Sequence, residues 1–125
     1  NYTRDYEKAR KKSPDRPPLS EAQMAALPEV THPMVRTHPD TGRKALYVNE
    51  GHTIGVDGMA KEAGQALLDE LFEFSTGPEF IYRHEWRRHD VLFWDNRRAL
   101  HHALPYDQQH VRHMHRVTFA GDRPV

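Results

Sequence analysis

The stretch that decides the fold is Phe93-Trp94-Asp95-Asn96-Arg97-Arg98-Ala99-Leu100-His101-His102. It joins a short apolar run to a polar turn and then to a pair of histidines. Asp and Asn side chains commonly bond to nearby backbone, so Asp95 and Asn96 are expected to form the turn rather than to bind a ligand. Adjacent residues of an extended chain point to opposite faces, so only one of His101 and His102 can enter a site. By itself, the histidine pair is a weak signal for a metal site.

The segment 111–120 alternates in the way that a β-strand does. Arg112 and Arg116 share one face with Met114 and Thr118, and the opposite face carries Val111, His113, His115, Val117 and Phe119. Four residues of strand separate the two guanidinium groups by about 13 Å, which is too far to hold one small carboxylate together. The spacing suits two separate anions or the two ends of one cavity, because the planar guanidinium binds carboxylate or sulfonate oxygens through two hydrogen bonds. Two exposed arginines on an edge strand are the alternative.

The combination of these features resembles the C-terminal signature of the taurine dioxygenase and 2,4-dichlorophenoxyacetate dioxygenase family. In this sequence the signature is Trp94-Asp95-Asn96-Arg97, then His101, then Arg112 and Arg116 at eleven and fifteen residues after the histidine. The segments 31–39, 42–49, 78–80 and 121–124 also look like family segments in family order, so the resemblance covers roughly residues 30–125. His89-Asp90 and Tyr106-Asp107-Gln108 resemble the aryloxyalkanoate branch of this family.

The resemblance implies an Fe(II)/2-oxoglutarate-dependent dioxygenase. Such enzymes hold iron with two histidines and one carboxylate on one face of the metal and leave three positions open for 2-oxoglutarate and dioxygen. By motif position, His101 would be the second histidine ligand and Arg112 would bind the distal carboxylate of 2-oxoglutarate. Arg116 would pair with the sulfonate or carboxylate of a small anionic organic substrate, which would be hydroxylated with succinate and CO2 as co-products.

The sequence departs from the family pattern at the other two iron ligands. The family takes them from an upstream His-x-Asp or His-x-Glu motif, and here only His38-Pro39-Asp40 has that spacing, within an expected hairpin turn. His101 is therefore the one ligand of three that the sequence supplies. The chain is a truncation, a natural fragment that pairs with another chain, or a degenerate non-catalytic relative, and the loop-like composition of its first residues favours the first explanation.

Composition narrows the class of protein further. Eighteen Lys and Arg balance eighteen Asp and Glu among the 125 residues, which gives no electrostatic reason to expect nucleic acid or a charged membrane surface as a partner. The absence of cysteine excludes disulfides, Cys-ligated zinc and thiol nucleophiles. No apolar stretch approaches the roughly 18 residues of a membrane span. We expect a soluble, cytoplasmic protein, with a homo-oligomer for the intact enzyme.

The predicted fold is a β-rich α+β domain, part of a double-stranded β-helix (jelly-roll) core with one amphipathic helix packed on the sheet. Residues 1–30 are expected to be a loop-like segment with a short helix over 20–27, and residues 31–125 the C-terminal half of the jelly roll. Residues 49–58 are expected to form a Gly-rich loop. The helix predicted over 61–74 has Ala63, Leu67, Leu71 and Phe74 on one face. The strands are predicted over 34–37, 44–48, 79–86, 90–94 and 111–120.

A second function class remains open on the sequence alone. Seven of the ten histidines lie between residues 84 and 115. Histidine is the commonest metal ligand, so a non-catalytic histidine-rich metal-binding or interaction module would take up metal through His110, His113 and His115. In that case 2-oxoglutarate would have no effect on metal binding.

Overall fold

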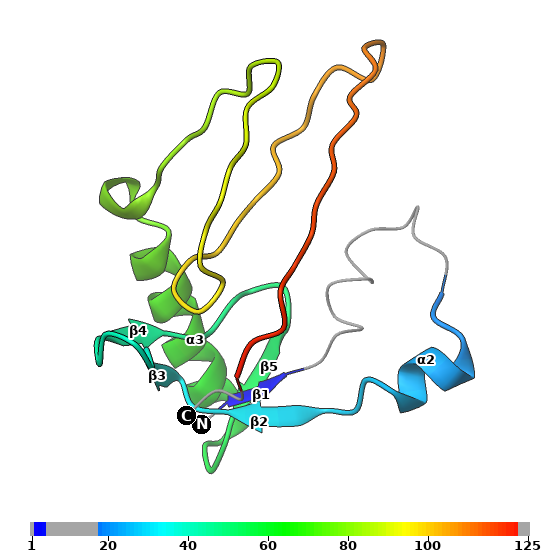
Figure 1. Cartoon of the computed structure of the whole chain (residues 1–125). Helices are drawn as coiled ribbons and strands as arrows, with labels where there is room; N and C mark the ends of the chain where they lie inside the picture. The colour runs from blue at the N-terminus through cyan, green and yellow to red at the C-terminus, as the bar shows by residue number, and fades with distance from the viewer. Residues whose placement is uncertain (1, 5–17, 123–125) are drawn as a thin grey trace.

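The computed structural model describes residues 2–4 and 18–122. Two small antiparallel sheets and one long helix form the body of the molecule, and two long extended excursions of the chain rise from it (Figure 1). The elements in chain order are β1 (Tyr2–Arg4), α2 (Glu21–Ala25), β2 (Val30–His32), β3 (Val35–Thr37), β4 (Lys44–Leu46), β5 (Thr53–Val56), α3 (Lys61–Ser75) and the 3-10 helix η1 (Pro78–Phe80). No helix within these residues has the length and apolar character to cross a membrane.

The first sheet has the order β2-β1-β5, with β1 in the middle and both pairings antiparallel. Tyr2 stands opposite His32 on one side and Val56 on the other. The sequence predicted loops both for the chain start and for 49–58, and the structure contradicts this for β1 and β5. Strands of three or four residues are too short to show a clear alternation, so their pairing depends on long-range contacts. The remainder of the first expected loop, residues 5–17, lies outside the described residues.

The hairpin and the short helix follow the prediction. β3 and β4 pair antiparallel, with Val35 opposite Leu46, and Gly42 in their connection has φ 67°, a left-handed conformation that glycine adopts without a steric cost. Helix α2 begins at the N-cap Ser20, whose hydroxyl accepts a hydrogen bond from the Gln23 N–H while the Gln23 side chain bonds back to the Ser20 N–H. This reciprocal capping box explains why so short a helix forms.

Helix α3 forms as predicted but buries a different face. Leu68 is 1% exposed and packs with Val48, which is 2% exposed. Around this pair lie the half-buried side chains of Met34, Tyr47, Val56, Leu71 and Phe72. The predicted face included Ala63 and Phe74, and both are exposed. Gly64 is buried on the same face as Leu68 and lies close to Val56 of β5.

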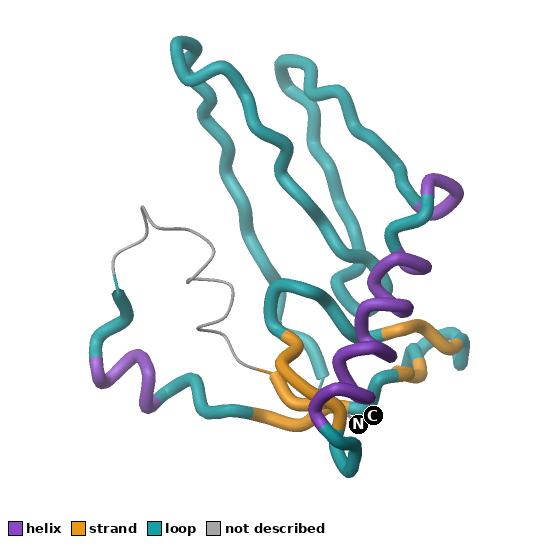
Figure 2. Tube along the Cα trace, turned by 180° about the vertical axis from the view of Figure 1, so that it is seen from behind, coloured by secondary structure: helices purple, strands orange, loops and turns teal. Residues whose placement is uncertain are grey.

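Residues 81–122 contain no helix or paired strand. The first excursion runs outward from residue 81 to a turn at 88–89 and returns to a turn at 96–98. The second excursion runs from residue 99 to a tip at 108–110 and returns to residue 122. Both views show the two excursions side by side (Figure 2). The predicted strands 79–86, 90–94 and 111–120 are therefore wrong as hydrogen-bonded strands, since the described chain gives them no backbone partner. Their apolar side chains are exposed, up to 92% for Val91 and 95% for Val111.

Candidate functional site

His101 lies at the start of the second excursion, where Trp94 and Arg116 contact it. The indole of Trp94 lies against its ring, with centroids 5.2 Å apart and planes inclined at 47°. Arg116 Nη1 lies 3.4 Å from His101 Nε2. A guanidinium only donates, so a hydrogen bond at this place requires Nε2 to accept, and a metal bound at Nε2 would replace that contact. His101, Arg112 and Arg116 all border one open hollow between the excursions.

Arg112 makes a contact of its own. Its guanidinium carbon lies 5.2 Å from the centroid of the Tyr106 ring, which is a cation–π geometry. The two arginines of this segment therefore contact different groups, Tyr106 for Arg112 and His101 for Arg116. All of residues 111–120 are exposed, and among them Met114 is 44% exposed whereas Val111 and Val117 are 95% and 85% exposed.

The histidine-rich alternative gains no support from the geometry. His113 and His115 also border the open hollow, but their rings stack on each other, with centroids 6.0 Å apart. His110 Nε2 lies 3.9 Å from Asp107 Oδ2. Among the described residues no three His, Asp or Glu side chains converge in a way that could hold a metal ion. The same observation means that His101 does not form a complete iron site with any other described residue.

The turn that precedes His101 is held by the side chains expected to form it. Asp95 Oδ1 accepts a hydrogen bond of 2.8 Å from the Arg97 N–H, which is an Asx turn. Trp94 Nε1 donates to Asn96 Oδ1 at 2.9 Å. The prediction that Asp95 and Asn96 shape the turn is confirmed.

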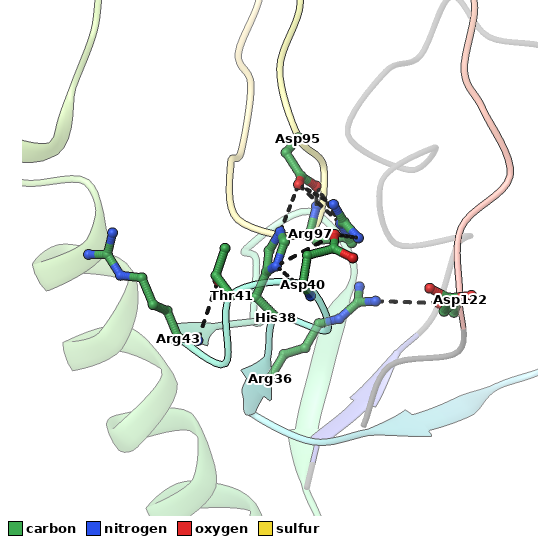
Figure 3. Close-up of polar contacts among 8 residues, drawn as sticks. All are labelled: Arg36, His38, Asp40, Thr41, Arg43, Asp95, Arg97 and Asp122. Atoms are coloured by element: carbon green, nitrogen blue, oxygen red, sulfur yellow. Dashed lines mark hydrogen bonds and ion pairs between the residues drawn. The ribbon is translucent and has the colours of Figure 1, made fainter.

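A cluster of four polar side chains attaches this turn to the loop between β3 and β4, and we call it the His38 clamp (His38, Asp40, Asp95 and Arg97; Figure 3). His38 Nε2 lies 3.0 Å from Asp95 Oδ2, and His38 Nδ1 accepts a hydrogen bond of 3.2 Å from the Asp40 N–H. Arg97 completes the cluster through ion pairs of 2.8 Å to Asp95 and 2.9 Å to Asp40. Because Nδ1 accepts, Nε2 carries the ring proton and donates it to Asp95.

The charges of the clamp stabilise one another. Hydrogen bonds from the Arg97 guanidinium, and secondarily from His38, hold the pKa of the Asp95 carboxyl well below its usual range. In return, the hydrogen bond to Asp95 raises the pKa of Arg97 above its ordinary value. A carboxylate that accepts several charge-assisted hydrogen bonds stays ionised far into the acid range.

The His38-Pro39-Asp40 segment belongs to the clamp in this arrangement. Both ring nitrogens of His38 are engaged, Nδ1 by the Asp40 N–H and Nε2 by Asp95. Its contact with Asp95 was not predicted. The two residues are 57 positions apart, and no local pattern in the sequence links them.

Arg36 of β3 makes a third connection between the hairpin and the excursions. Its side chain is 5% exposed, lies over the Tyr47 ring at 5.2 Å, and donates from Nη2 to the Asp122 carbonyl oxygen at 3.4 Å. Its Nε finds no hydrogen-bond acceptor within the described part of the chain. The two ends of the second excursion are thus both tied to the strand β3 or the loop that follows it.

The sequence is similar to known proteins over most of its length. The sequence pattern of the taurine catabolism dioxygenase TauD, TfdA family matches residues 1–118. The chain belongs to this family. The match includes residues 1–30, where the resemblance had not been visible.

Individual members of the TauD, TfdA family give the extent of the likeness. The chain is 41% identical over 104 residues to the alpha-ketoglutarate-dependent 2,4-dichlorophenoxyacetate dioxygenase of Burkholderia sp. (strain RASC), covering 83% of this chain and 35% of that protein. It is 33% identical over 96 residues to the alpha-ketoglutarate-dependent sulfonate dioxygenase of Saccharomyces cerevisiae, covering 75% and 23%. The solved structure of AAD-2 in complex with Mn(II) and N-oxalylglycine superposes with a TM-score of 0.64 at 31% identity, covering 78% and 38%. The chain thus spans about a third of the first relative's length.

Proposed function

We propose that this chain is part of an Fe(II)/2-oxoglutarate-dependent dioxygenase in which His101 is an iron ligand. The observation that carries the proposal is the position of the His101 ring, which lies against Trp94 and beside Arg116 and borders the hollow in a member of the TauD, TfdA family. The relatives' names, and the Mn(II) and N-oxalylglycine in the AAD-2 structure, support a metal and a 2-oxoglutarate-like ligand for this chain's family. Iron and dioxygen would supply the oxidising chemistry.

In this proposal the two arginines bind different anions. Arg112 would bind the distal carboxylate of 2-oxoglutarate, and Arg116 would pair with the acidic group of the substrate. The substrate would be a small organic anion, an aryloxy- or alkyl-carboxylate or a sulfonate. Among the relatives, one is named for 2,4-dichlorophenoxyacetate, an aryloxy-carboxylate, and one for a sulfonate. The two arginines contact different groups, Tyr106 for Arg112 and His101 for Arg116, which supports separate roles.

The remaining parts of the enzyme would come from residues beyond those described. They include the first histidine, the carboxylate ligand, and the strands that would pair with the excursions to close a double-stranded β-helix. The proposal further includes a cytoplasmic enzyme that forms a homo-oligomer and needs neither nucleic acid nor a membrane. Fractionation of the source cells and light scattering on the complete protein would test these last points.

The first experiment is an anaerobic titration of the protein encoded by the complete coding sequence that contains this chain. Fe(II) and 2-oxoglutarate are added together, and the visible charge-transfer band of their chelate is followed, with the intact mass measured on the same sample. We expect a band in the unchanged protein and in the exposed control His110→Ala, and its loss in His101→Ala. A band that survives His101→Ala would remove His101 from the iron site.

Binding measurements on the same protein distinguish the proposed role of Arg112 from that of Arg116. Arg112→Ala should weaken 2-oxoglutarate binding, whereas Arg116→Ala should raise the KM for the organic anion and leave 2-oxoglutarate binding nearly unchanged. Arg98→Ala, an exposed position outside the hollow's proposed anion sites, is the control. Succinate release with phenoxy-carboxylates and with sulfonates would then identify the substrate class, and unaltered 2-oxoglutarate affinity in Arg112→Ala would refute the assigned role.

A further inference from the structure

Among the described residues, few side chains attach the two excursions to the body of the molecule. Within the described residues, the side-chain hydrogen bonds and ion pairs that join 81–122 to the preceding chain come from Arg36, His38 and Asp40. Of these three, His38 is the one that combines burial with a short contact, since it is 6% exposed and lies 3.0 Å from Asp95. Asp40, by contrast, has a side chain that is 69% exposed.

We propose that His38 is a positioning residue, which fixes the turn at Asp95 and thereby sets the place and orientation of the ring of His101. This inference rests on the proposed function for its consequence in iron binding. His38 itself touches neither metal nor substrate in this proposal, because both of its ring nitrogens are engaged by Asp95 and by the Asp40 N–H. It acts through the turn.

The path from His38 to His101 consists of contacts that follow one another without a gap. His38 holds the Asp95 carboxylate, and the same carboxylate shapes the turn through the Arg97 N–H and guanidinium. Trp94, next to Asp95 in the chain, places its indole against the His101 ring. A turn held at Asp95 therefore fixes both ends of the segment that presents the imidazole.

The geometry explains why this position uses histidine. The ring nitrogen Nδ1 lies close to the backbone of His38 and accepts from the Asp40 N–H, whereas Nε2 lies further out and donates to Asp95. An asparagine side chain can accept from the Asp40 N–H but is too short to donate to Asp95. Glutamine is long enough to place an N–H near Asp95. His38→Asn and His38→Gln are therefore a matched polar pair that differ in their reach to Asp95.

The first test measures position directly and needs no metal. Nuclear Overhauser cross-peaks between the indole protons of Trp94 and the ring protons of His101 are recorded for the metal-free protein, His38→Asn, His38→Gln and the exposed control His110→Asn. We expect the cross-peaks to persist in the unchanged protein, in His38→Gln and in His110→Asn, and to be lost or strongly weakened in His38→Asn. Equal cross-peaks in all four proteins would overturn the proposal.

The second test measures the consequence. In the chelate titration we expect Fe(II) affinity about tenfold weaker in His38→Asn, the lower end of the usual effect of groups that orient a ligand, and a recovery in His38→Gln. Normal affinity in His38→Asn, together with loss of the band in His101→Ala, would refute the positioning role and leave the proposed function intact. Absence of the band in the unchanged protein would instead refute the proposed function, and the cross-peaks would still decide the role of His38.

Discussion

Nε2 of His38 lies 3.0 Å from Oδ2 of Asp95, although 57 positions separate the two residues in the chain. The contact joins the loop after β3 to the turn before His101, and Arg97 bonds to the same carboxylate at 2.8 Å. A buried imidazole and a guanidinium thus share one anion. The ionisation of Asp95 is therefore the property on which this junction depends.

The first prediction concerns the titration of Asp95. Because hydrogen bonds from Arg97 and His38 favour the ionised form, its pKa in the folded protein lies below the ordinary value of 3.8. A folded-state pKa that is lower than the unfolded one favours the folded state above pH 3.8, and this contribution is lost as the pH falls through the folded-state value. Carbon-detected NMR of the Asp95 carboxyl should show it still ionised at pH 3.8.

The matched variant for this titration is Arg97→Ala, which removes the first cause of the shift. We expect the Asp95 carboxyl of that variant to take up its proton at a higher pH, closer to 3.8. The variant should also unfold at a lower temperature at neutral pH. An Asp95 titration that is identical in the two proteins would contradict the clamp.

The second prediction concerns the core. Leu68 is 1% exposed, so Leu68→Ala removes buried methyl groups from a core of few residues and should reduce the free energy of unfolding by about 2–5 kcal/mol. Leu100→Ala is a matched control, because Leu100 is 61% exposed and its truncation should change stability by less than about 0.5 kcal/mol. Urea denaturation followed by circular dichroism measures both. Equal effects would show that α3 does not pack as described.

The third prediction concerns Gly64 of α3. A β-carbon at this position would lie 3.5 Å from Val56 Cβ and 3.7 Å from Met59 Cβ, which are ordinary van der Waals distances. Gly64→Ala should therefore gain the higher helix propensity of alanine without a clash and stabilise the protein by about 0.5–1 kcal/mol. Gly64→Leu should destabilise it, since the larger side chain has no room against β5. Thermal unfolding of the two variants checks the sign of each effect.

The fourth prediction concerns the apolar faces of the excursions. Val111, Val117 and Phe119 are 95%, 85% and 78% exposed in the 125-residue chain. Extended segments with exposed apolar side chains and unpaired backbone groups associate readily. The 125-residue chain produced by itself should bind the dye ANS and self-associate with rising concentration, and Val111→Lys with Val117→Lys should reduce both. A chain that stays monomeric and does not bind the dye would contradict this prediction.

The elements that the sequence predicted are those with strong local signals. Helix α3 has a long periodic pattern, α2 has a Ser20 cap, and the β3–β4 hairpin has Pro, Asp and Gly between two apolar runs. The strands β1 and β5 were missed because they are three and four residues long and depend on partners far along the chain. The buried face of α3 was misplaced because an apolar pattern does not reveal that a glycine faces the sheet.

The candidate site likewise has features that the sequence predicted and features that it did not. The turn-forming role of Asp95 follows from side-chain chemistry, and the structure agrees with it. The contact between His101 and Arg116 is seen only in the structure. The roles of His101, Arg112 and Arg116 in ligand binding remain predictions. The part played by His38 could not be predicted, because a contact between residues so distant in sequence is created by the fold and leaves no trace in local composition.

The position of β1 in the middle of its sheet has a consequence for the order of events during synthesis. β1 ends at Arg4, whereas its partners β2 and β5 end at His32 and Val56. The three-stranded sheet is therefore complete only after Val56 has been synthesised, which at 5–20 residues per second is roughly 3–10 s after Arg4. Until then β1 lacks one of its two neighbours, so this sheet cannot finish forming before β5 has left the ribosome.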